Sequence, residues 1–369
     1  MHSLLLAALL VSQDTARWEP VARVVEAAVA GRAFPGAVVA IGRRDSVLYL
    51  HAFGHLDYEH GQPVQTSTVY DIASLTKVVG LTTALMQLVA QHRVDLDSPA
   101  VRYVPAFQNR SITVRQLLTH SSGLPAFKQW WTRVHSRDDM FALANAEPLE
   151  QPPGTHMVYS DIGALVMTQV VENVSGERLD QYLESQLFAP LGLRDTRFNP
   201  PADWLDRIAP TEMDHNWRHA MVRGQVHDEN AASMGGVSGH AGMFSTAPDL
   251  VRFAQMMLSC FGHQPPATSH QPVVNCTTVQ EFAQVQQPGF SSRALGWDTP
   301  NSNSSAGGLL SPQSFGHTGF TGTSMWMDPS RDLFVILLTN RVHPTRENTQ
   351  IFQVRRAVAD AAVLVADGR

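Results

Sequence analysis

The sequence predicts an α/β protein of the α+β type, in which one antiparallel sheet is made by both ends of the chain. Short apolar runs bounded by turn residues lie near the N-terminus, at 37–41 and 47–53, and again within 314–339. Longer apolar helix candidates fill the middle. The simplest architecture therefore flanks one sheet with helices and inserts a mostly helical region at about 75–225.

Length and composition limit the classes of protein to which this chain can belong. It has 369 residues, and at roughly 100–200 residues per domain this length suits one large domain or two interleaved ones. No internal repeat or clear linker interrupts it, so we expect a single domain over 13–369. With 44% apolar and 16% charged residues, the composition is globular and excludes a wholly disordered chain. The net charge of −6 and the lack of a basic run argue against nucleic acid as a partner.

The N-terminus carries an apolar run from Leu4 to Val11, which is followed by the small residue Ser12. This run is too short to span a bilayer but suits the apolar core of a secretory signal. We therefore expect 1–12 to be a signal peptide and the protein to be periplasmic or secreted. The alternative is an N-terminal helix packed on a cytoplasmic protein. No apolar run approaches 18 residues, so we expect no stable membrane span.

Each element is predicted from its pattern and its boundary residues. Near the N-terminus a helix over 18–30 precedes two strands that meet at the turn 42–46. Three strands near the C-terminus turn at 328–332 and are followed by a last helix. Thr113 and Thr246 carry the spacing of a capping box at two helix starts. The later helices are expected at 73–91, 113–119, 162–174, 178–188, 246–260 and 349–366.

The only two cysteines, Cys260 and Cys276, flank a loop rich in Pro and His. In an exported protein a disulfide would close this loop, whereas in a cytoplasmic protein both would be ordinary thiols. Neither lies in a C-x-x-C or other metal-binding pattern.

Ser74-Leu-Thr-Lys77 places a hydroxyl and an amine three residues apart at the start of the 73–91 helix, where such positions share a face. A serine hydroxyl becomes a good nucleophile only when a base takes its proton. Lysine can assist if burial lowers its pKa towards neutrality. Lys77 is the only charged residue between Ile72 and Gln91, which predicts that it is buried.

Two further triplets could carry chemistry. Tyr159-Ser-Asp161 starts a helix, and a phenol beside a cationic lysine can shift towards phenolate and act as a general base. His317-Thr-Gly319 lies within a strand candidate, where glycine lets a ligand approach the backbone. An edge strand there could offer an N–H to an oxyanion and pair with a peptide-like substrate. Each triplet alone is equally compatible with ordinary packing.

The order of these motifs resembles that of the penicillin-recognising serine hydrolases, whose motifs are S-x-x-K, Y-x-N and K/H-T/S-G. That superfamily includes class C β-lactamases, D-alanyl-D-alanine peptidases and related esterases. The similarity covers about 20–360 and extends to the segments 117–125 (LLTHSSGLP), 190–193 (PLGL) and 235–249 (GGVSGHAGMFSTAPD). It implies the fold of that superfamily, an acyl-enzyme mechanism and no cofactor.

The resemblance also implies a role for each motif residue. Ser74 would be the nucleophile, Lys77 its activating partner and Tyr159 the base that then protonates the leaving group. The oxyanion hole would consist of the backbone N–H groups of Ser74 and Phe320. The residues bordering the substrate would be His317, Thr318 and Gly319.

Two residues depart from the pattern of the β-lactamases. Asp161 replaces an asparagine whose amide contacts the substrate, and a carboxylate there can accept but not donate a hydrogen bond. His317 replaces a lysine, which weakens the fixed positive charge that holds a lactam carboxylate. Both changes argue against efficient β-lactam hydrolysis. The segments 224–231, 239–242 and 315–344 look like a branch associated with cell-wall fragments, which includes carboxypeptidases and muropeptide amidases.

We therefore expect a serine hydrolase that forms an acyl-enzyme at Ser74 with an amide, peptide or ester derived from peptidoglycan. Alternatives in the same class are a class C-like β-lactamase and a small-ester esterase. An alternative in another class is a slowly acylated or non-catalytic protein that binds penicillin or muropeptides. The presence of Ser74, Lys77 and Tyr159 argues against an inactive domain.

Other residues offer rival sites. Asp228 and Glu229 could line the mouth of the pocket, and Ser238 is a second candidate nucleophile, although no G-x-S-x-G elbow surrounds it. We expect no metal, because the sequence has no H-E-x-x-H motif. A metal hydrolase would instead have to use His215, His219 and His227.

Overall fold

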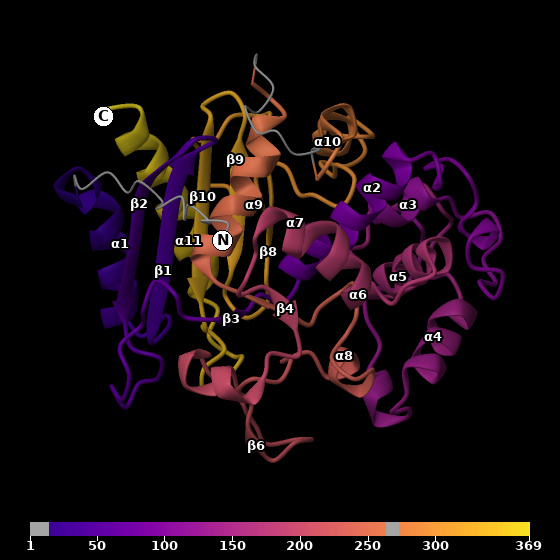
Figure 1. The fold of residues 1–369 in the computed structure, drawn as a ribbon, viewed down its shortest axis with the longest axis horizontal. Helices are drawn as coiled ribbons and strands as arrows, with labels where there is room; N and C mark the ends of the chain where they lie inside the picture. The colour runs from indigo at the N-terminus through magenta and orange to yellow at the C-terminus, as the bar shows by residue number, and fades with distance from the viewer. Residues whose placement is uncertain (1–14, 263–272) are drawn as a thin grey trace, which may run out of the picture.

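The computed structural model describes residues 15–262 and 273–369. At the centre of the protein lies a five-stranded antiparallel sheet of order β2-β1-β10-β9-β8. Register pairs Ala37 of β1 with Thr339 of β10, so the first and last strands of the chain lie side by side (Figure 1). The predicted sheet from both chain ends is therefore confirmed. Its strands are β1 (Gly36–Arg43), β2 (Ser46–Gly54), β8 (Phe315–Thr318), β9 (Ser324–Asp328) and β10 (Leu333–Thr339).

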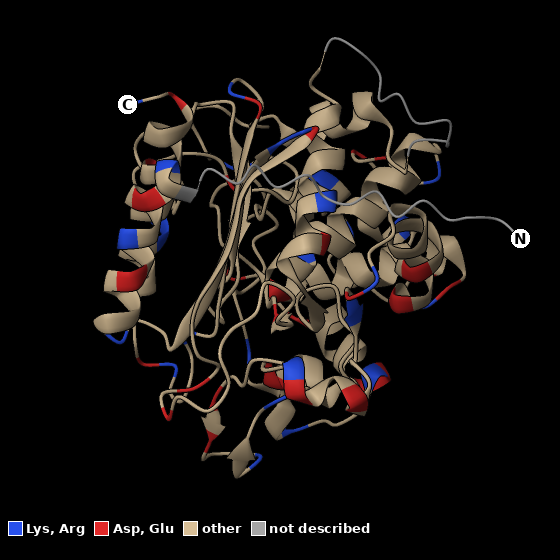
Figure 2. Ribbon diagram, turned by 60° about the vertical axis from the view of Figure 1, so that its left-hand side comes forward, with Lys and Arg blue, Asp and Glu red and all other residues tan. Residues whose placement is uncertain are grey.

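Helices cover both faces of this sheet, as Figure 2 shows. On one face α1 (Glu19–Ala30) packs beside α11 (Ile351–Ala366), and on the other α9 (Ala247–Ser259) packs against β1 and β10. Alternate residues of β1 therefore enter two different cores. Those facing α1 and α11 are Ala37, Val39 and Ile41, whereas those on the opposite face are Val38 and Ala40.

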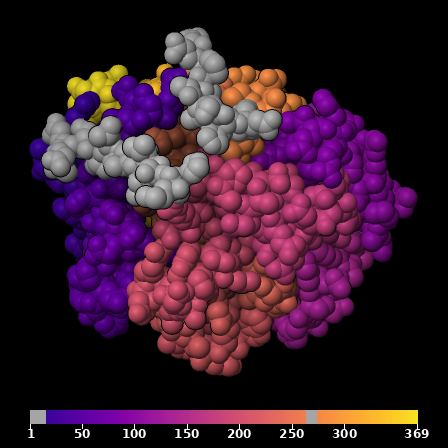
Figure 3. All heavy atoms as spheres, viewed as in Figure 1, coloured from indigo at the N-terminus to yellow at the C-terminus, as the bar shows by residue number. Residues whose placement is uncertain are grey.

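A helical region fills one side of the molecule, seen in magenta in Figure 3 beside the indigo N-terminal part of the sheet. The predicted helix over 73–91 forms, but its first part, Lys77–Thr82, is a π-helix that continues into α2 (Thr83–Ala90). The remaining helices of this region are α3 (Val114–Leu118), α4 (Arg137–Ala146), α5 (Asp161–Ser175), α6 (Leu179–Leu183) and α7 (Ala189–Leu191), with a π-helix over Glu184–Phe188 and 3-10 turns at Ala100–Arg102 and Trp130–Thr132.

Short elements that the sequence pattern did not predict connect the helices to the sheet. Strands this short make too few alternating positions to leave a periodic signal. A three-stranded sheet of order β3-β7-β4 lies directly before the Ser74 segment, since β3 ends at Asp71. These elements are β3 (Tyr70–Asp71), β4 (Arg197–Phe198), β7 (Met243–Ser245), β5 (Met213–Asp214), β6 (Ala220–Met221), a 3-10 helix at Ala202–Arg207, α8 (Glu229–Ser233) and α10 (Cys276–Ala283).

Of the two predicted capping boxes, one is confirmed and one is wrong. Thr113 Oγ1 accepts the Gln116 N–H at 3.2 Å, and Gln116 Oε1 accepts the Thr113 N–H at 3.0 Å. The Thr246 side chain makes no capping hydrogen bond. Asp249, the other member of that predicted box, instead accepts the backbone N–H of Asp195 at 2.7 Å. Asp249 therefore bonds a residue far away in the sequence and not the start of its own helix.

The disulfide and the lack of a membrane-spanning helix concern the chain as described. Cys260 and Cys276 form a disulfide that joins the end of α9 to the start of α10. In the described part of the chain, no helix combines the length and apolar character needed to cross a membrane. The predicted signal peptide over 1–12 lies outside the described residues.

Candidate active site

Lys77 is buried, as predicted, and its ammonium group contacts three acceptors. Its exposed fraction is 3%. Nζ donates to Ser74 Oγ at 3.2 Å and to the His240 carbonyl at 2.8 Å, and it lies 2.7 Å from Asp161 Oδ1. Because an ammonium has three N–H groups, these contacts use all of its donors. Ser74 Oγ thus receives a hydrogen bond from Lys77, and its own proton is free to go elsewhere.

The condition under which Lys77 could act as a base, a pKa lowered towards neutrality, is not met. Burial does lower this pKa, but the charges of Asp161 and Tyr159 oppose burial and leave the pKa raised above its ordinary value. Lys77 is therefore a cation at neutral pH. A cation can orient Ser74 and stabilise nearby negative charge, but it cannot accept the serine proton.

Tyr159 stands between cations and imidazole rings at the start of α5. Its hydroxyl is buried and lies close enough to the Lys77 ammonium to help raise the pKa of that lysine. Lys77 Nζ lies 4.9 Å and the Arg293 guanidinium carbon 5.3 Å from the centre of its ring. The rings of His120 and His317 lie 4.6 and 5.6 Å from it, centre to centre. A negative charge that develops on the phenol oxygen would face two cations.

The turn between β8 and β9 carries the third motif. Gly319 has no room for a side chain, because a Cβ atom there would lie 2.4 Å from the Ile72 carbonyl and 2.1 Å from Thr323 Oγ1. This close approach brings the turn against the segment that leads into Ser74. Among the described residues, neither the Ser74 N–H nor the Phe320 N–H donates to another group. Two unused donors are what an oxyanion hole requires.

His317 does not supply the positive charge that a lysine would. Its Nδ1 lies 2.8 Å from the Thr318 carbonyl, and since a carbonyl only accepts, Nδ1 carries a proton. Burial, with the nearby charges of Arg293 and Lys77, lowers the pKa of His317 well below its ordinary value, so the ring is neutral at pH 7. Nε2 then holds a free lone pair, and it is buried without a partner within the described residues.

These groups meet in a cavity of about 230 Å³. Lys77 and Asp161 are not among its lining residues. Asp161 lies against Lys77, and its contact with substrate stays a prediction. The lining residues are Ser74, Tyr159, Arg293, Asp298, His317, Thr318, Gly319, Phe320, Arg341, Phe352 and Arg355.

Three arginines of this cavity were missed by the sequence analysis. Arg293 has one guanidinium nitrogen, Nη1, that is buried and unpartnered within the described residues, and its nearest acidic group, on Asp298, is 3.9 Å away. Arg341 and Arg355 lie behind the β8–β9 turn and donate to its carbonyl groups. No motif surrounds any of the three, so only tertiary structure brings them to the site.

His120 was also missed, although the segment 117–125 was singled out. Its Nδ1 accepts the Ser160 N–H at 3.1 Å, and burial lowers its pKa well below the ordinary value. The neutral His120 ring therefore packs on the Tyr159 ring and is hydrogen-bonded to Ser160, the residue before α5.

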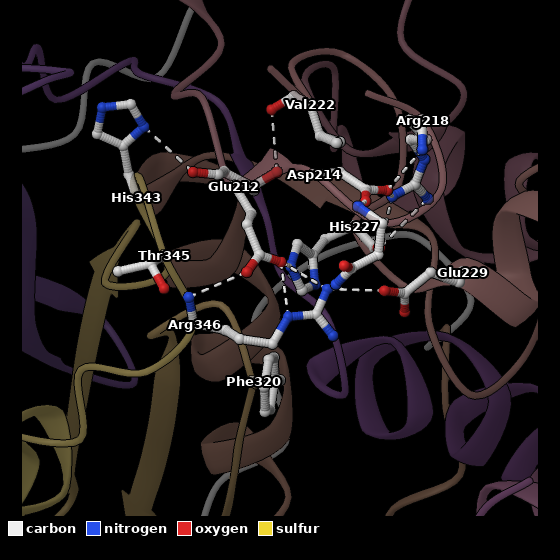
Figure 4. A network of polar contacts seen from close by, with 12 residues as sticks. Glu212, Asp214, Arg218, Val222, His227, Glu229, Phe320, His343, Thr345 and Arg346 are labelled. Atoms are coloured by element: carbon white, nitrogen blue, oxygen red, sulfur yellow. Dashed lines mark hydrogen bonds and ion pairs between the residues drawn. The ribbon is translucent and has the colours of Figure 1, made fainter. Parts of the chain in front are cut away.

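A network of acidic and basic side chains borders the Phe320 side of the cavity (Figure 4). Glu212 lies 2.9 Å from His227 Nε2 and accepts from Arg346 Nε at 2.6 Å. Arg346 Nη2 also lies 2.7 Å from Glu229. Glu229 is not among the residues that line the cavity, and its carboxylate is held by Arg346.

The rival nucleophile Ser238 lies in a hydrogen-bonded chain with His240 and Asp228, but it is fully buried. Ser238 Oγ is 2.6 Å from His240 Nδ1, and Asp228, which caps α8, is 2.9 Å from His240 Nε2. His215 and His219 lie exposed near the β5–β6 hairpin, whereas His227 bonds Glu212. Across 15–262 and 273–369, no three His, Cys, Asp or Glu side chains are grouped so that they could hold a metal ion.

Comparisons with known proteins show the family of this chain. The model of the family described as Beta-lactamase matches residues 21–360. A protein of Escherichia coli strain K12 named "Putative D-alanyl-D-alanine carboxypeptidase" is 33% identical over 350 residues, which cover 84% of this chain and 79% of that protein.

Two solved structures share the fold. A penicillin-binding protein homologue from Caulobacter crescentus is 20% identical with a TM-score of 0.74, and the match covers 95% of this chain and 98% of that one. A class C β-lactamase is 19% identical with a TM-score of 0.74, over 95% and 99%. The chain therefore belongs to the β-lactamase family and is one of the penicillin-recognising serine hydrolases.

Proposed function

We propose that this serine hydrolase is a carboxypeptidase that acts on peptide fragments of peptidoglycan through an acyl-enzyme at Ser74. The observation that carries this proposal is the contact of Ser74 Oγ with a buried, charged Lys77, at a cavity that is also lined by Arg293, whose Nη1 has no partner within the described residues. Lys77 supports nucleophilic attack by Ser74, and Arg293 suits a substrate that ends in a carboxylate.

In the acylation step, Tyr159 acts as a phenolate: Ser74 Oγ attacks the substrate carbonyl carbon, and its proton passes to the phenolate oxygen. The Ser74 and Phe320 N–H groups receive the developing oxyanion. When the carbon–nitrogen bond breaks, Tyr159 returns the proton to the leaving amine. Water then attacks the ester carbonyl at Ser74 while Tyr159 takes a proton from it. When the carbon–Oγ bond breaks, Tyr159 gives that proton to Ser74 Oγ, the acid product leaves and free enzyme is regenerated. Lys77 remains charged throughout and stabilises the phenolate.

Arg293 supports the choice of a carboxypeptidase. A buried guanidinium with a free N–H is poorly satisfied until an anion arrives, and a carboxylate gives it a charge-assisted hydrogen bond. The leaving group of a carboxypeptidase is an amino acid with a free carboxylate. Because His317 is neutral, the cation for this carboxylate is Arg293 in place of the lysine of β-lactamases. The name of the Escherichia coli relative agrees with this choice.

A cell-wall substrate requires a compartment outside the cytoplasm, and we propose that the protein is periplasmic or secreted. The disulfide Cys260–Cys276 supports this, because such bonds persist in oxidising compartments. The predicted signal over 1–12 has the same implication.

The test compares wild type with Ser74→Ala on three substrates: a neutral p-nitrophenyl ester, an N-acylated peptide ending in D-Ala-D-Ala, and the same peptide with an amidated C-terminus. We expect Ser74-dependent turnover of the ester and of the free-acid peptide, with the amide much poorer. Ester turnover that survives Ser74→Ala would refute the mechanism. Rapid hydrolysis of a chromogenic cephalosporin with no peptide turnover would favour a β-lactamase, and ester turnover alone an esterase. A stable covalent adduct without turnover would indicate a binding protein.

Arg293→Gln separates the carboxylate subsite from the chemistry. We expect it to raise KM for the free-acid peptide by roughly 10- to 100-fold, as for a lost charge-assisted hydrogen bond. The neutral ester is the internal control, since it has no carboxylate to lose. Equal losses on both substrates would contradict the assignment of Arg293.

A further inference from the structure

We infer that Arg355 is a positioning residue that holds the β8–β9 turn, and with it the Phe320 N–H, in place against the Ser74 segment. This inference rests on the proposed function, because it assumes that the Phe320 N–H receives the oxyanion. Arg355 belongs to α11, far from all three motifs in the sequence, and is 4% exposed.

Arg355 contacts both ends of the turn with a single nitrogen. Its Nη2 donates to the Gly319 carbonyl at 2.6 Å and to the Thr323 carbonyl at 2.8 Å. Within the turn, the Gly319 N–H bonds the Thr323 carbonyl at 2.8 Å, and the Gly322 N–H bonds the Gly319 carbonyl at 3.1 Å. One guanidinium therefore closes a five-residue turn from behind, with Phe320 at its exposed tip.

The same turn is bonded to the residues that precede Ser74. Thr321 Oγ1 donates to the Asp71 carbonyl at 2.7 Å, and Thr323 Oγ1 donates to the Ile72 carbonyl at 3.1 Å. The two proposed oxyanion donors thus belong to one hydrogen-bonded frame. Arg355 supports this frame at the Gly319 and Thr323 carbonyls, and Arg341 adds a bond from Nε to the Phe320 carbonyl at 2.8 Å.

The charge of Arg355 is otherwise unexplained. No acidic side chain pairs with it in the described part of the chain, and its two acceptors are backbone carbonyls. Burial lowers its pKa to about 9, and the charge of Arg341 adds to this effect. A guanidinium buried without a carboxylate is unfavourable for stability alone. Its carbonyl acceptors lie in the turn that presents the Phe320 N–H, which points to a role in positioning that donor.

Direct binding of substrate is the competing role, since Arg355 lines the cavity and its Nε is unpartnered within the described residues. The two roles affect different substrates. A residue that positions the oxyanion donor affects acylation by every substrate, including neutral esters, whereas a carboxylate-binding residue affects only anionic substrates.

The experiment measures kcat/KM for the neutral ester and for the free-acid peptide in Arg355→Gln and Arg355→Lys. It also measures inhibition by phenylboronic acid, whose boron bonds to Ser74 Oγ and places an oxygen in the oxyanion hole. We expect Arg355→Gln to lower kcat/KM by about 10- to 100-fold on both substrates, as for a misplaced oxyanion donor. The boronate inhibition constant should rise by a similar factor. Arg355→Lys should recover part of the loss, and so should guanidinium ion added to Arg355→Ala.

Arg356→Gln is the matched control. Arg356 lies on the same helix and also donates to two carbonyls, those of Ser302 and Ser304, but it does not line the cavity. We expect wild-type activity from it. Thermal unfolding of each variant identifies any that fail to fold, in which case Arg355→Lys carries the test.

Two outcomes would overturn the inference. A loss confined to the free-acid peptide would make Arg355 a substrate-binding residue, and unchanged kinetics in all variants would leave it without a role in positioning. In both cases Ser74-dependent turnover by wild type would leave the proposed function intact. If wild type itself shows no such turnover, the proposed function fails and this inference fails with it.

Discussion

The buried Lys77 and the partly exposed Asp161 form an ion pair, with Nζ 2.7 Å from Oδ1, and the same Nζ donates to the Ser74 hydroxyl. In sequence they lie 84 positions apart, and the helix that starts at Asp161 brings them together. The pair keeps Lys77 charged, because Asp161 opposes the lowering of its pKa by burial. The family's asparagine could not do this.

Asp161→Asn should make Lys77 titrate within the assay range. Without the carboxylate, burial is opposed only by Tyr159, and the Lys77 pKa falls from its raised value. Because only the protonated lysine stabilises a phenolate, kcat/KM of the variant should decline towards pH 9, where wild type is still rising or level. The measurement is ester turnover from pH 5 to 9. The exposed Asp138→Asn is the control, and a variant profile that overlays wild type would contradict this role for Asp161.

Lys77→Ala should lower kcat/KM by at least ~10²-fold, in the range of lost acid–base assistance. The substitution removes the hydrogen bond to Ser74 Oγ and leaves Asp161 buried without its partner. Lys128→Ala serves as the control, since Lys128 is the only other lysine of the chain and pairs with Glu147 and Glu150 at the surface. Equal activity in both variants would exclude Lys77 from the chemistry.

KM for a carboxylate-bearing peptide should be nearly constant between pH 6 and 8. The pKa of His317 is lowered, so this ring is neutral throughout the interval, while a guanidinium such as that of Arg293 stays protonated. If His317 supplied the positive charge instead, KM would rise about tenfold per pH unit above its pKa. KM and kcat of the C-terminally amidated peptide are measured over the same pH range, as the control for effects of pH on catalysis.

Glu212→Gln should reduce the acid sensitivity of the fold. Burial raises the Glu212 pKa, but hydrogen bonds and charge from His227 and Arg346 outweigh burial and lower it from 4.5 to about 2. Its ionised form therefore stabilises the fold fully above pH 4.5, and this contribution is lost as the pH falls from 4.5 to about 2. Denaturant unfolding at several pH values should show that the variant is less stable than wild type at pH 7. Its free energy of unfolding should also fall less than that of wild type when the pH drops below 4.5. Glu184→Gln, at an exposed position, should retain the wild-type dependence.

Removal of the disulfide with Cys260→Ser and Cys276→Ser should lower the free energy of unfolding by ~3 kcal/mol, the value for a loop of about 15 residues. The two cysteines are 16 positions apart and neither lines the cavity, so ester turnover of the folded variant should match wild type. Denaturant unfolding of oxidised and reduced protein checks the first expectation. No difference between them would show that the bond does not constrain the unfolded chain.

Much of the fold was predictable because its signals are local. Strands such as β1 and β10 carry continuous apolar runs between turn residues, and the Thr113–Gln116 box needs only neighbours in sequence. The prediction failed at Thr246, where Asp249 bonds the distant Asp195. Two-residue strands such as β3 were also missed, since pairing with a distant strand is all that defines them.

The sequence by itself determined the sheet from both chain ends, the order of the three motifs and the burial of Lys77, because apolar periodicity and residue spacing record these directly. Only the tertiary structure decided the charge of Lys77, the neutrality of His317 and the presence of Arg293 and Arg355 in the cavity. Protonation depends on burial and on charges a few ångströms away in space, and those neighbours come from segments far apart in the chain.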